Sequence, residues 1–321
     1  MPIRVGVVGV GNLGQYHARV YHDLKEATLV GVVDSSPDRA KEIAKKQKTQ
    51  AFTSLEELLK AGVEAVSVVV PTSLHHEVAT RCLEAGCHVL LEKPIASTVE
   101  QADDLTRLAH EKGRILQIGH IERFNQAVQA LQKLKTVPRF IESHRMGPFV
   151  PRNLDTGVVL DLMIHDIDII LNLVQSKVVS VEGVGIPVLS PTEDIANARI
   201  KFESGCIANL TASRISPEKM RKIRVFQEDA YLSIDYINQG VELVQKKKGK
   251  APLFGGMQLG DVYITREKMP IEKGDSLQNE ISDFLECVRT GRPPQVTGEK
   301  GREALALALE ITRQIRQLSK S

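Results

Sequence analysis

The sequence contains no tryptophan, and its aromatic residues amount to only 4% of 321 positions. Long apolar runs are also missing, since stretches such as residues 66–70 are far shorter than the roughly 20 apolar residues that a membrane-spanning helix needs. The short apolar runs speak against a membrane-spanning chain. A chain of 321 residues is instead long enough for two ordinary folded domains.

Neither sign of charge prevails, because 42 basic and 40 acidic residues give a formal net charge of +2. The sequence therefore lacks the basic excess typical of proteins that bind nucleic acids or membrane surfaces, and we expect neither partner. Four cysteines fit neither a zinc-site spacing nor a dense disulfide framework. We expect reduced thiols, no metal site and, since the N-terminus lacks a signal-peptide layout, a cytoplasmic protein.

The most informative local pattern is a glycine-rich turn between two apolar runs. Apolar residues 3–8 lead into G-V-G-N-L-G at 9–14, and a helical stretch follows at 15–24. A second apolar run, 28–33, ends at Asp34. The G-x-G-x-x-G pattern alone is weak, but between a strand and a helix, with an acid twenty residues on, it predicts a dinucleotide-binding site.

Each residue of this pattern has its own physical reason. Gly9 permits a tight turn, Gly11 lets the backbone approach a pyrophosphate, and Gly14 lets helix and strand pack closely. Asp34 would accept hydrogen bonds from ribose hydroxyls and repel a 2′-phosphate, so we expect NAD rather than NADP, a preference that the nearby Arg39 would soften. The predicted cofactor contacts here are Gly9, Gly11, Asn12, Leu13, Gly14 and Asp34.

Strands and helices continue to alternate up to residue 119. The apolar run 65–70 ends at a polar loop, and a sixth apolar run covers 115–119. Six strands alternating with helices predict a doubly wound parallel sheet whose ligands bind at the carboxyl ends of the strands. Pro71, Thr72 and His75 are therefore predicted to lie along the nicotinamide half of the cofactor. The alternative for His75 is a helix-start residue without a ligand.

The fifth apolar run, 88–91, leads directly into Glu92, Lys93 and Pro94. A lysine that ends a buried strand points to the ligand edge of the sheet. Pro94 would fix the direction of the lysine, and a cis bond between the two residues is one way to do so. We predict that Glu92 and Lys93 lie at the cofactor.

In the second half, residues 157–174 have the apolar content and length of a helix. Their polar members recur at spacings of three and four, which would place them on one face. They are Asp161, His165, Asp168 and Asn172. One interpretation is the wet face of an amphipathic helix; the other is that Asp161 orients His165 beside a substrate hydroxyl.

After Lys177 the pattern changes to short alternating strands separated by turns, at 178–186, 197–202, 206–213, 221–227 and 230–235. No crossover helices interrupt these strands, which predicts a mainly antiparallel sheet. Residues 246–250 are expected to form a solvated turn, 255–261 a mobile loop, and 275–289 and 299–318 two amphipathic helices. The predicted domains are 1–121, for the cofactor, and 122–321, for the substrate and for oligomer contacts.

Two basic positions are candidates for binding an anionic substrate. Arg152 lies in the loop 147–156, and Arg214 belongs to a basic cluster near Pro217 that would suit a nucleotide diphosphate. An ordinary solvated loop explains the basic cluster equally well.

Several motifs follow one another along the chain: P-T-x-x-H at 71–75, E-K-P at 92–94, G-H-I-E-R-F-N at 119–125, G-P-F at 147–149 and D-L-M-I-H-D-I-D at 161–168. Over essentially its whole length the sequence thereby resembles the Gfo/Idh/MocA family of NAD(P)-dependent sugar and sugar-nucleotide oxidoreductases. Within that family it is most similar to members that oxidise C3 of UDP-linked N-acetylglucosamine. One departure is Gln126, where such members usually carry proline.

The resemblance implies a second domain with an open, mainly antiparallel sheet that often makes the oligomer contact, and hence a homodimer or homotetramer. It implies a catalytic lysine, aspartate and histidine, which correspond to Lys93, Asp161 and His165. It adds His120 to the cofactor contacts. The predicted substrate contacts are Lys93, Arg123, Asn125, Arg152, His165 and Arg214.

The expected reaction moves a hydride from a secondary alcohol to the cofactor and a proton to a base. A lysine has an ordinary pKa of about 10.4, which burial and a cationic nicotinamide ring would lower, whereas a histidine starts nearer neutrality. The sequence does not decide between the two, and we expect that His165 takes the proton while Lys93 holds the hydroxyl. The alternatives are a dehydrogenase of a free sugar or polyol, and a non-catalytic NAD-binding regulator.

Overall fold

The computed structural model describes residues 1–134, 136–151, 156–252 and 256–318. The chain divides into two compact units. The first comprises Met1–Phe124 and Asp275–Ala306, and the second comprises Asn125–Gly274 and Leu307–Ser321. The first break lies close to the predicted boundary after residue 121, but the first unit also takes a segment from the C-terminal part of the chain.

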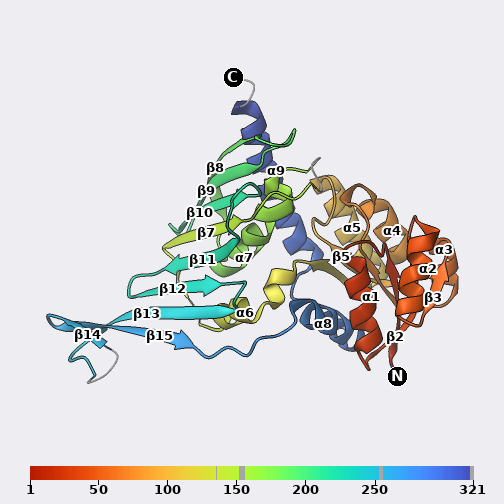
Figure 1. The fold of residues 1–321 in the computed structure, drawn as a ribbon, viewed down its shortest axis with the longest axis horizontal. Helices are drawn as coiled ribbons and strands as arrows, with labels where there is room; N and C mark the ends of the chain where they lie inside the picture. Colours follow the sequence, from red (N-terminus) through yellow and green to blue (C-terminus); the bar gives the residue numbers. More distant parts are fainter. Residues whose placement is uncertain (135, 152–155, 253–255, 319–321) are drawn as a thin grey trace. The chain divides into compact units, whose positions relative to one another are not determined.

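The first unit contains a six-stranded parallel sheet in the order β3-β2-β1-β4-β5-β6, with helices between the strands (Figure 1). This confirms the predicted doubly wound fold. Its elements are β1 (Ile3–Val8), α1 (Gly14–Asp23), β2 (Ala27–Val33), α2 (Pro37–Lys46), β3 (Gln50–Phe52), α3 (Leu55–Lys60), β4 (Ala65–Val68), η1 (Thr72–Leu74), α4 (His75–Glu84), β5 (His88–Glu92), α5 (Val99–Lys112), β6 (Leu116–Gly119), η2 (Ile121–Phe124), α8 (Ser276–Thr290) and the start of α9 (Gly298–Leu318).

Local signals start and stop these helices. The hydroxyls of Ser36, Ser54 and Thr98 accept backbone N–H groups at the starts of α2, α3 and α5. Gly113, in the left-handed conformation, ends α5. Such side-chain caps stabilise a helix by about 1 kcal/mol each.

Helix α8 belongs to the first unit because of its apolar face. Ile281, Phe284 and Leu285 join the same buried cluster as Val5 and Tyr21. Burying a side chain of this size stabilises a fold by about 1.5–3 kcal/mol. A domain boundary set at one chain position therefore does not describe this unit, since α8 lies about 150 residues beyond the end of its sheet.

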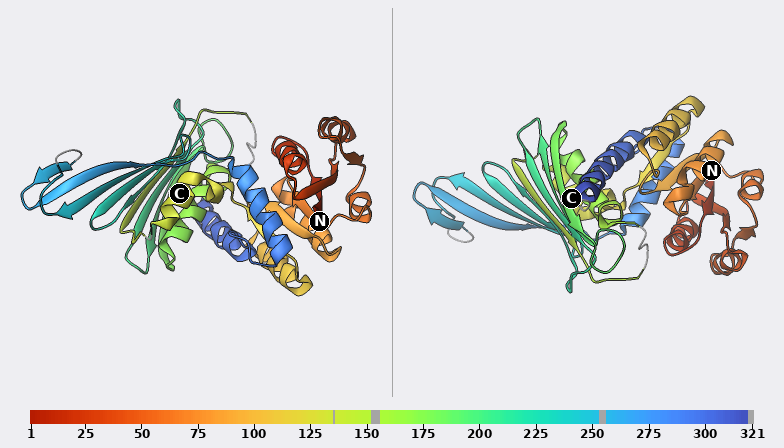
Figure 2. Two further views of the ribbon diagram at one scale, coloured as in Figure 1. Left: turned by 90° about the horizontal axis from the view of Figure 1, so that it is seen from below. Right: turned by 90° about the horizontal axis from the view of Figure 1, so that it is seen from above.

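The second unit contains a nine-stranded sheet in the order β14-β15-β13-β12-β11-β7-β10-β9-β8. Only β7 and β10 pair in parallel, so the predicted mainly antiparallel sheet is confirmed. Its elements are α6 (Gln126–Lys133), β7 (Phe140–Met146), η3 (Val159–Met163), α7 (Ile164–Val174), β8 (Val178–Ile186), β9 (Ile195–Phe202), β10 (Ile207–Ser213), β11 (Met220–Phe226), β12 (Ala230–Asp235), β13 (Gly240–Lys248), β14 (Gly256–Leu259), β15 (Val262–Met269) and the end of α9. Figure 2 shows α6 and α7 on one face of this sheet.

Two predictions for this sheet are wrong. Most of the expected solvated turn at 246–250 lies in β13, and the described part of the expected loop at 255–261 forms β14 and a turn. Strands β13, β14 and β15 extend as an arm (Figure 1) and keep much of both faces partly or fully exposed. They therefore lack the alternation of apolar and polar residues from which a strand is predicted.

The expected regular helix at 157–174 is also only partly correct. Residues Val159–Met163 form a π-helix, and the α-helix α7 begins after it. Asp168, predicted to lie on a polar face, is only 2% exposed, and Ile169 and Ile170 beside it are fully buried. A π turn holds more residues than an α turn, so spacings of three and four do not map onto one face across it.

Candidate active site

The glycine turn joins β1 to α1 at the carboxyl end of the parallel sheet. Gly9 has a φ of +86°, and a Cβ atom there would overlap the carbonyl oxygen of Val69. A Cβ atom on Gly14 would overlap the carbonyl oxygen of Gly9. These two glycines are therefore required by the turn itself.

Gly11 differs, because a Cβ atom there would meet no atom within 4 Å. Gly11, Asn12 and Leu13 are exposed at the N-terminus of α1. Their backbone N–H groups and the helix dipole can hold a pyrophosphate, and the absence of a side chain on Gly11 leaves room for it. The residues present therefore fit a dinucleotide cofactor.

Asp34, which follows β2, stabilises the glycine turn through hydrogen bonds. Its Oδ2 accepts the N–H of Val10 at 2.8 Å, and its Oδ1 accepts the N–H of Ser36 at 2.9 Å. Arg39 donates from Nε to the carbonyl oxygen of Val10 at 2.9 Å. An acid, Asp34, and a base, Arg39, therefore both bind the glycine turn. The balance of their charges there affects whether NAD or NADP is preferred.

Glu92 and Lys93 end β5 at the same edge of the sheet. The Glu92 side chain is 13% exposed; its Oε1 lies 3.3 Å from Nε2 of His17, and its Oε2 accepts the N–H of Lys93 at 3.1 Å. Burial alone would raise the pKa of Glu92, but His17 and Lys93 outweigh it and lower the pKa. Lys93 is half-buried, and the Lys93–Pro94 bond is cis. A lysine is thus held beside an ionised carboxylate at the ligand edge.

His75 has a different surrounding from the one expected. Its ring is 1% exposed, with Nδ1 at 2.8 Å from the Pro94 carbonyl oxygen and Nε2 at 2.9 Å from that of Val70. Burial lowers the pKa of His75 more than these carbonyls raise it. A neutral ring has one N–H and donates to only one of these two carbonyl oxygens, but it lies buried between the loops after β4 and β5. We therefore do not include His75 among the proposed cofactor contacts.

The motif at 119–125 is also largely buried. His120 is 1% exposed, and Arg123 and Asn125 are each 4% exposed. The Asn125 side chain caps α6 by accepting the N–H of Ala127 at 3.1 Å, and it donates to the Tyr236 carbonyl oxygen at 3.2 Å. At least for Asn125, the amide has a structural task within the second unit.

In the second unit, Asp161 lies in the π-helix η3 and His165 in the first turn of α7, and both are half-buried. π-Helical turns often occur at functional sites. The next residue, Asp166, forms an ion pair with Arg145 of β7, and both side chains are 2% exposed. This ion pair fixes the helical turn that carries the imidazole.

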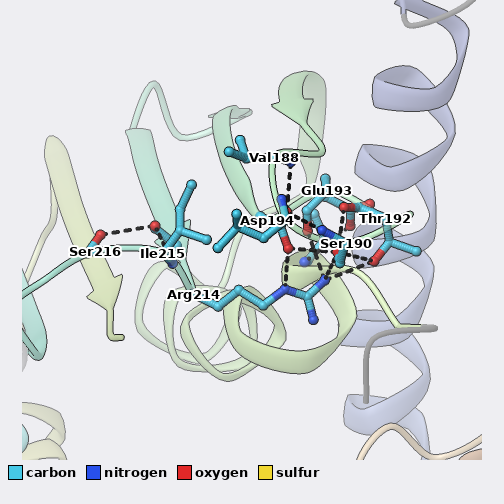
Figure 3. A network of polar contacts seen from close by, with 11 residues as sticks. Val188, Ser190, Thr192, Glu193, Asp194, Arg214, Ile215 and Ser216 are labelled. Atoms are coloured by element: carbon cyan, nitrogen blue, oxygen red, sulfur yellow. Dashed lines mark hydrogen bonds and ion pairs between the residues drawn. The ribbon is translucent and has the colours of Figure 1, made fainter. Parts of the chain in front are cut away.

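Arg214 points into its own unit (Figure 3). It donates from Nε to Oδ1 of Asp194 at 2.8 Å and from Nη2 to Thr192 Oγ1 at 2.8 Å, and it is 6% exposed. Burial alone would raise the pKa of Asp194, but hydrogen bonds from Ser190 and from the N–H groups of Val188 and Leu189 hold it well below its usual range. The expected role of Arg214 in binding a diphosphate is therefore replaced by a role in holding this loop. The other predicted anion ligand, Arg152, lies outside the described residues.

Three buried titratable residues have no signal in the sequence, and two of them, His17 and Arg145, contact a partner far away along the chain. In the sequence, His17 looks like an ordinary helix residue, but its side chain contacts Glu92, 75 positions away. Arg145 and Glu280 read as a strand charge and a surface charge, although both are buried. No local signal distinguishes them from solvated charges.

The comparisons with known proteins agree with this arrangement. Residues 3–120 match the GFO_IDH_MocA oxidoreductase family with an NAD-binding Rossmann fold, and residues 136–233 match the GFO/IDH/MocA C-terminal domain. The chain belongs to the Gfo/Idh/MocA family of oxidoreductases. It therefore uses a nicotinamide cofactor, as predicted.

Among curated relatives, the chain is 39% identical to UDP-N-acetylglucosamine 3-dehydrogenase of Acidithiobacillus ferrooxidans over 96% of each chain. A solved structure of that enzyme matches with a TM-score of 0.91, covering 99% of this chain and 98% of the other at 38% identity. The scyllo-inositol 2-dehydrogenase (NAD(+)) of Bacillus subtilis is 27% identical over 92% of this chain and 89% of its own.

The described residues lack two other kinds of functional feature. Among them, no helix is long and apolar enough to cross a membrane. Within the same part of the chain, no group of three or more histidine, cysteine, aspartate or glutamate side chains is placed to hold a metal ion.

Proposed function

We propose that this protein oxidises the C3 hydroxyl of UDP-linked N-acetylglucosamine with NAD. The observation that carries the proposal is the match in sequence and fold to UDP-N-acetylglucosamine 3-dehydrogenase over nearly the whole of both chains. Lys93, which follows β5 at the same edge of the sheet as the glycine turn, supplies the chemical group that such a reaction needs.

The bound nicotinamide would supply the hydride acceptor. The chain would supply position and proton transfer. We assign to Lys93 the binding of the reacting hydroxyl, and to His165 the removal of its proton, with Asp161 stabilising the protonated imidazole. The Arg145–Asp166 ion pair supports this assignment for His165, because a base must be held in one orientation to act.

For the cofactor we propose NAD rather than NADP. The Asp34 carboxylate at the glycine turn would repel a 2′-phosphate, which supports this choice. Arg39 binds the same turn and would reduce the preference without reversing it, since it is also paired with Glu42 at 2.8 Å. The proposed contacts along the cofactor are the glycine turn, Asp34, Pro71, Thr72, Glu92, Lys93 and His120.

The proposed substrate contacts are Lys93, His165 and Arg123, with Arg152 as a further candidate from the sequence alone; Asn125, also expected there, instead has its amide bound within the second unit. A cytoplasmic homodimer or homotetramer that associates through the sheet of the second unit is the form in which we expect the protein to work. Size-exclusion chromatography with light scattering tests the oligomeric state.

The deciding experiment mixes the purified protein and NAD with UDP-N-acetylglucosamine, myo-inositol or glucose in parallel and records the absorbance of reduced nicotinamide. We expect reduction with the UDP-sugar and little with the other two. Reduction with myo-inositol or glucose only would instead support a dehydrogenase of free sugars or polyols. NAD binding without reduction by any of the three would support a non-catalytic regulator.

The assigned roles are tested with Lys93→Met and His165→Ala. We expect each variant to lose at least about a hundredfold in kcat, because general acid–base groups contribute on the order of 10²–10⁴. Lys41→Met and His22→Ala, on exposed positions of helices in the first unit, are matched controls and should retain the rate. A Lys93→Met or His165→Ala variant with near-normal turnover would remove that residue from the proposal.

A further inference from the structure

Glu280 is a fully buried carboxyl in the first unit. It lies on α8 with 0% exposure, and neither of its side-chain oxygens has a hydrogen-bond partner among the described residues. Its backbone carbonyl accepts Nε2 of the buried Gln117 on β6 at 3.1 Å. A carboxylate in such a place would be very unfavourable, whereas a neutral carboxylic acid is tolerated.

A second carboxyl, that of Glu92, lies in the same unit. It belongs to a buried hydrogen-bonded chain in which His17 Nδ1 lies 3.2 Å from Ser67 Oγ, and Ser67 Oγ lies 2.8 Å from the Tyr21 hydroxyl. The two acids thus have opposite surroundings, since Glu92 has partners that favour its charge and Glu280 has none of these.

The charges around Glu280 favour its neutral form. Helix α8 packs against α1, β5 and η2. On these elements and on α8 itself, the titratable groups that interact electrostatically with Glu280 are Tyr21, Glu92 and Asp283. Asp283 forms an ion pair with Arg292 at 2.6 Å. The charged residues of η2 are Glu122 and Arg123. Burial, then Glu92 and then Asp283 raise the pKa of Glu280 well above its usual value.

We propose that Glu280 is a positioning residue that is protonated in the folded protein at neutral pH, so that the negative charge beside Lys93 remains on Glu92. This role rests on the proposed function of Lys93. If Glu280 were ionised, like-charge repulsion would favour protonation of Glu92. Glu92 would then lose its charge-assisted contact with His17 and its electrostatic hold on Lys93.

The state of Glu280 has a consequence for stability. An acid whose pKa is raised in the folded state contributes stability that is present below its unfolded pKa, about 4.3, and is lost as pH rises towards the folded pKa. Glu280→Gln, which is neutral at every pH, should therefore gain stability relative to the wild type between pH 5 and pH 9.

The first experiment measures the protonation state without substrate. The infrared difference spectrum of wild type minus Glu280→Gln at pH 8 should contain the carbonyl stretch of a protonated carboxylic acid. Denaturation midpoints of the two proteins should diverge as pH rises from 5 to 9. Absence of the band, or a midpoint difference that does not change with pH, would overturn the inference. If Glu280→Gln does not fold, Glu92→Gln serves instead, because removing the Glu92 charge should shift loss of the band to lower pH.

The second experiment measures the protonation of Lys93 directly. Acylation of Lys93 by acetic anhydride is followed against pH by mass spectrometry, with the exposed Lys41 as an internal reference. At alkaline pH both carboxyls of the wild type are ionised, so that Glu280 adds a second negative charge to that of Glu92 and the pair together favours the protonated form of Lys93. Glu280→Gln should therefore move the Lys93 labelling midpoint down by roughly one pH unit, whereas a merely structural acid would leave it unchanged and would refute the positioning role.

Activity is measured separately with NAD and UDP-N-acetylglucosamine. We expect Glu280→Gln to keep the neutral-pH kcat and the KM for the sugar while the alkaline limb of kcat shifts with the Lys93 midpoint. A protein that shows the acid band and the Lys93 shift but oxidises no UDP-sugar would refute the proposed substrate and support the inference. A rate that falls at neutral pH would mean that Glu280 is ionised there and would refute the inference.

Discussion

Arg145 and Asp166 form a buried ion pair in the second unit, with Nε to Oδ2 and Nη2 to Oδ1 both at 2.9 Å. Arg145 also lies over the Tyr236 ring, 5.4 Å from its centroid. Because Asp166 directly follows His165, this ion pair connects strand β7 to the turn that carries the proposed base. A buried pair adds little net stability over apolar residues, so its orientation of α7 is the more informative property.

Removing one partner should be more damaging than removing both. Arg145→Met leaves a buried, unpaired carboxylate and should lower the free energy of unfolding by about 3–5 kcal/mol. Arg145→Met combined with Asp166→Leu should recover most of that loss in urea unfolding. The exposed pair of Arg266 and Glu242 is the matched control, and Arg266→Met should cost less than about 1 kcal/mol. If Arg145→Met costs no more than this control, the pair does not hold the unit together.

Asp194 gives a prediction about pH. A carboxyl whose folded pKa is lowered contributes stability that is present above its unfolded pKa, about 3.9, and is lost as pH falls through the folded value. The Tm deficit of Asp194→Asn should thus be constant from pH 8 to about pH 5 and shrink below about pH 4. Asp229→Asn, at an exposed position near Lys246, should show no such deficit.

Arg214 belongs to the same network as Asp194. Measuring Tm together with the KM for the UDP-sugar distinguishes a structural role of Arg214 from a role in substrate binding. Arg214→Lys loses the planar fork that contacts Asp194 and Thr192, so we expect a lower Tm with little change in the KM for the UDP-sugar. A raised KM at an unchanged Tm would restore Arg214 to the substrate contacts.

The first unit could be predicted from the sequence because its signals are local. The glycine turn, the capping residues and the apolar runs each act within a few positions, and both Asp34 and Lys93 follow strands at the carboxyl edge of the sheet, as the general rule for parallel sheets predicts. The second unit could be predicted only where apolar and polar residues alternate, which is why β9 was found and the half-exposed arm β13–β15 was not.

The part that could not be predicted consists of contacts between distant residues. His17 lies 75 positions from its partner Glu92, and Arg145 lies 21 positions from Asp166. In the sequence, each of these charges looks like a member of a solvated surface. The π-helix before His165 is also invisible to a spacing rule that assumes an α-helix throughout.

The cofactor preference tests Asp34. Asp34→Asn keeps a carbonyl oxygen that can accept the Val10 N–H but removes the charge that repels a 2′-phosphate. The ratio of Kd values for NADPH and NADH, measured by fluorescence quenching, should fall at least tenfold, equivalent to about 1.4 kcal/mol. Asp38→Asn, at an exposed position of α2, should leave the ratio unchanged. An unchanged ratio in Asp34→Asn would assign the preference to another residue.

Gly11 separates what the fold needs from what the cofactor needs. A methyl group at Gly11 meets no protein atom within 4 Å, so Gly11→Ala should fold with an unchanged Tm, but it would occupy the space left for the pyrophosphate. We expect the Kd for NADH in fluorescence titration to rise at least tenfold, about 1.4 kcal/mol. Gly240→Ala, equally free of contacts but on β13, is the control and should bind normally. Normal NADH binding by Gly11→Ala would move the cofactor away from the glycine turn, because a ligand seated there has no room for the added carbon.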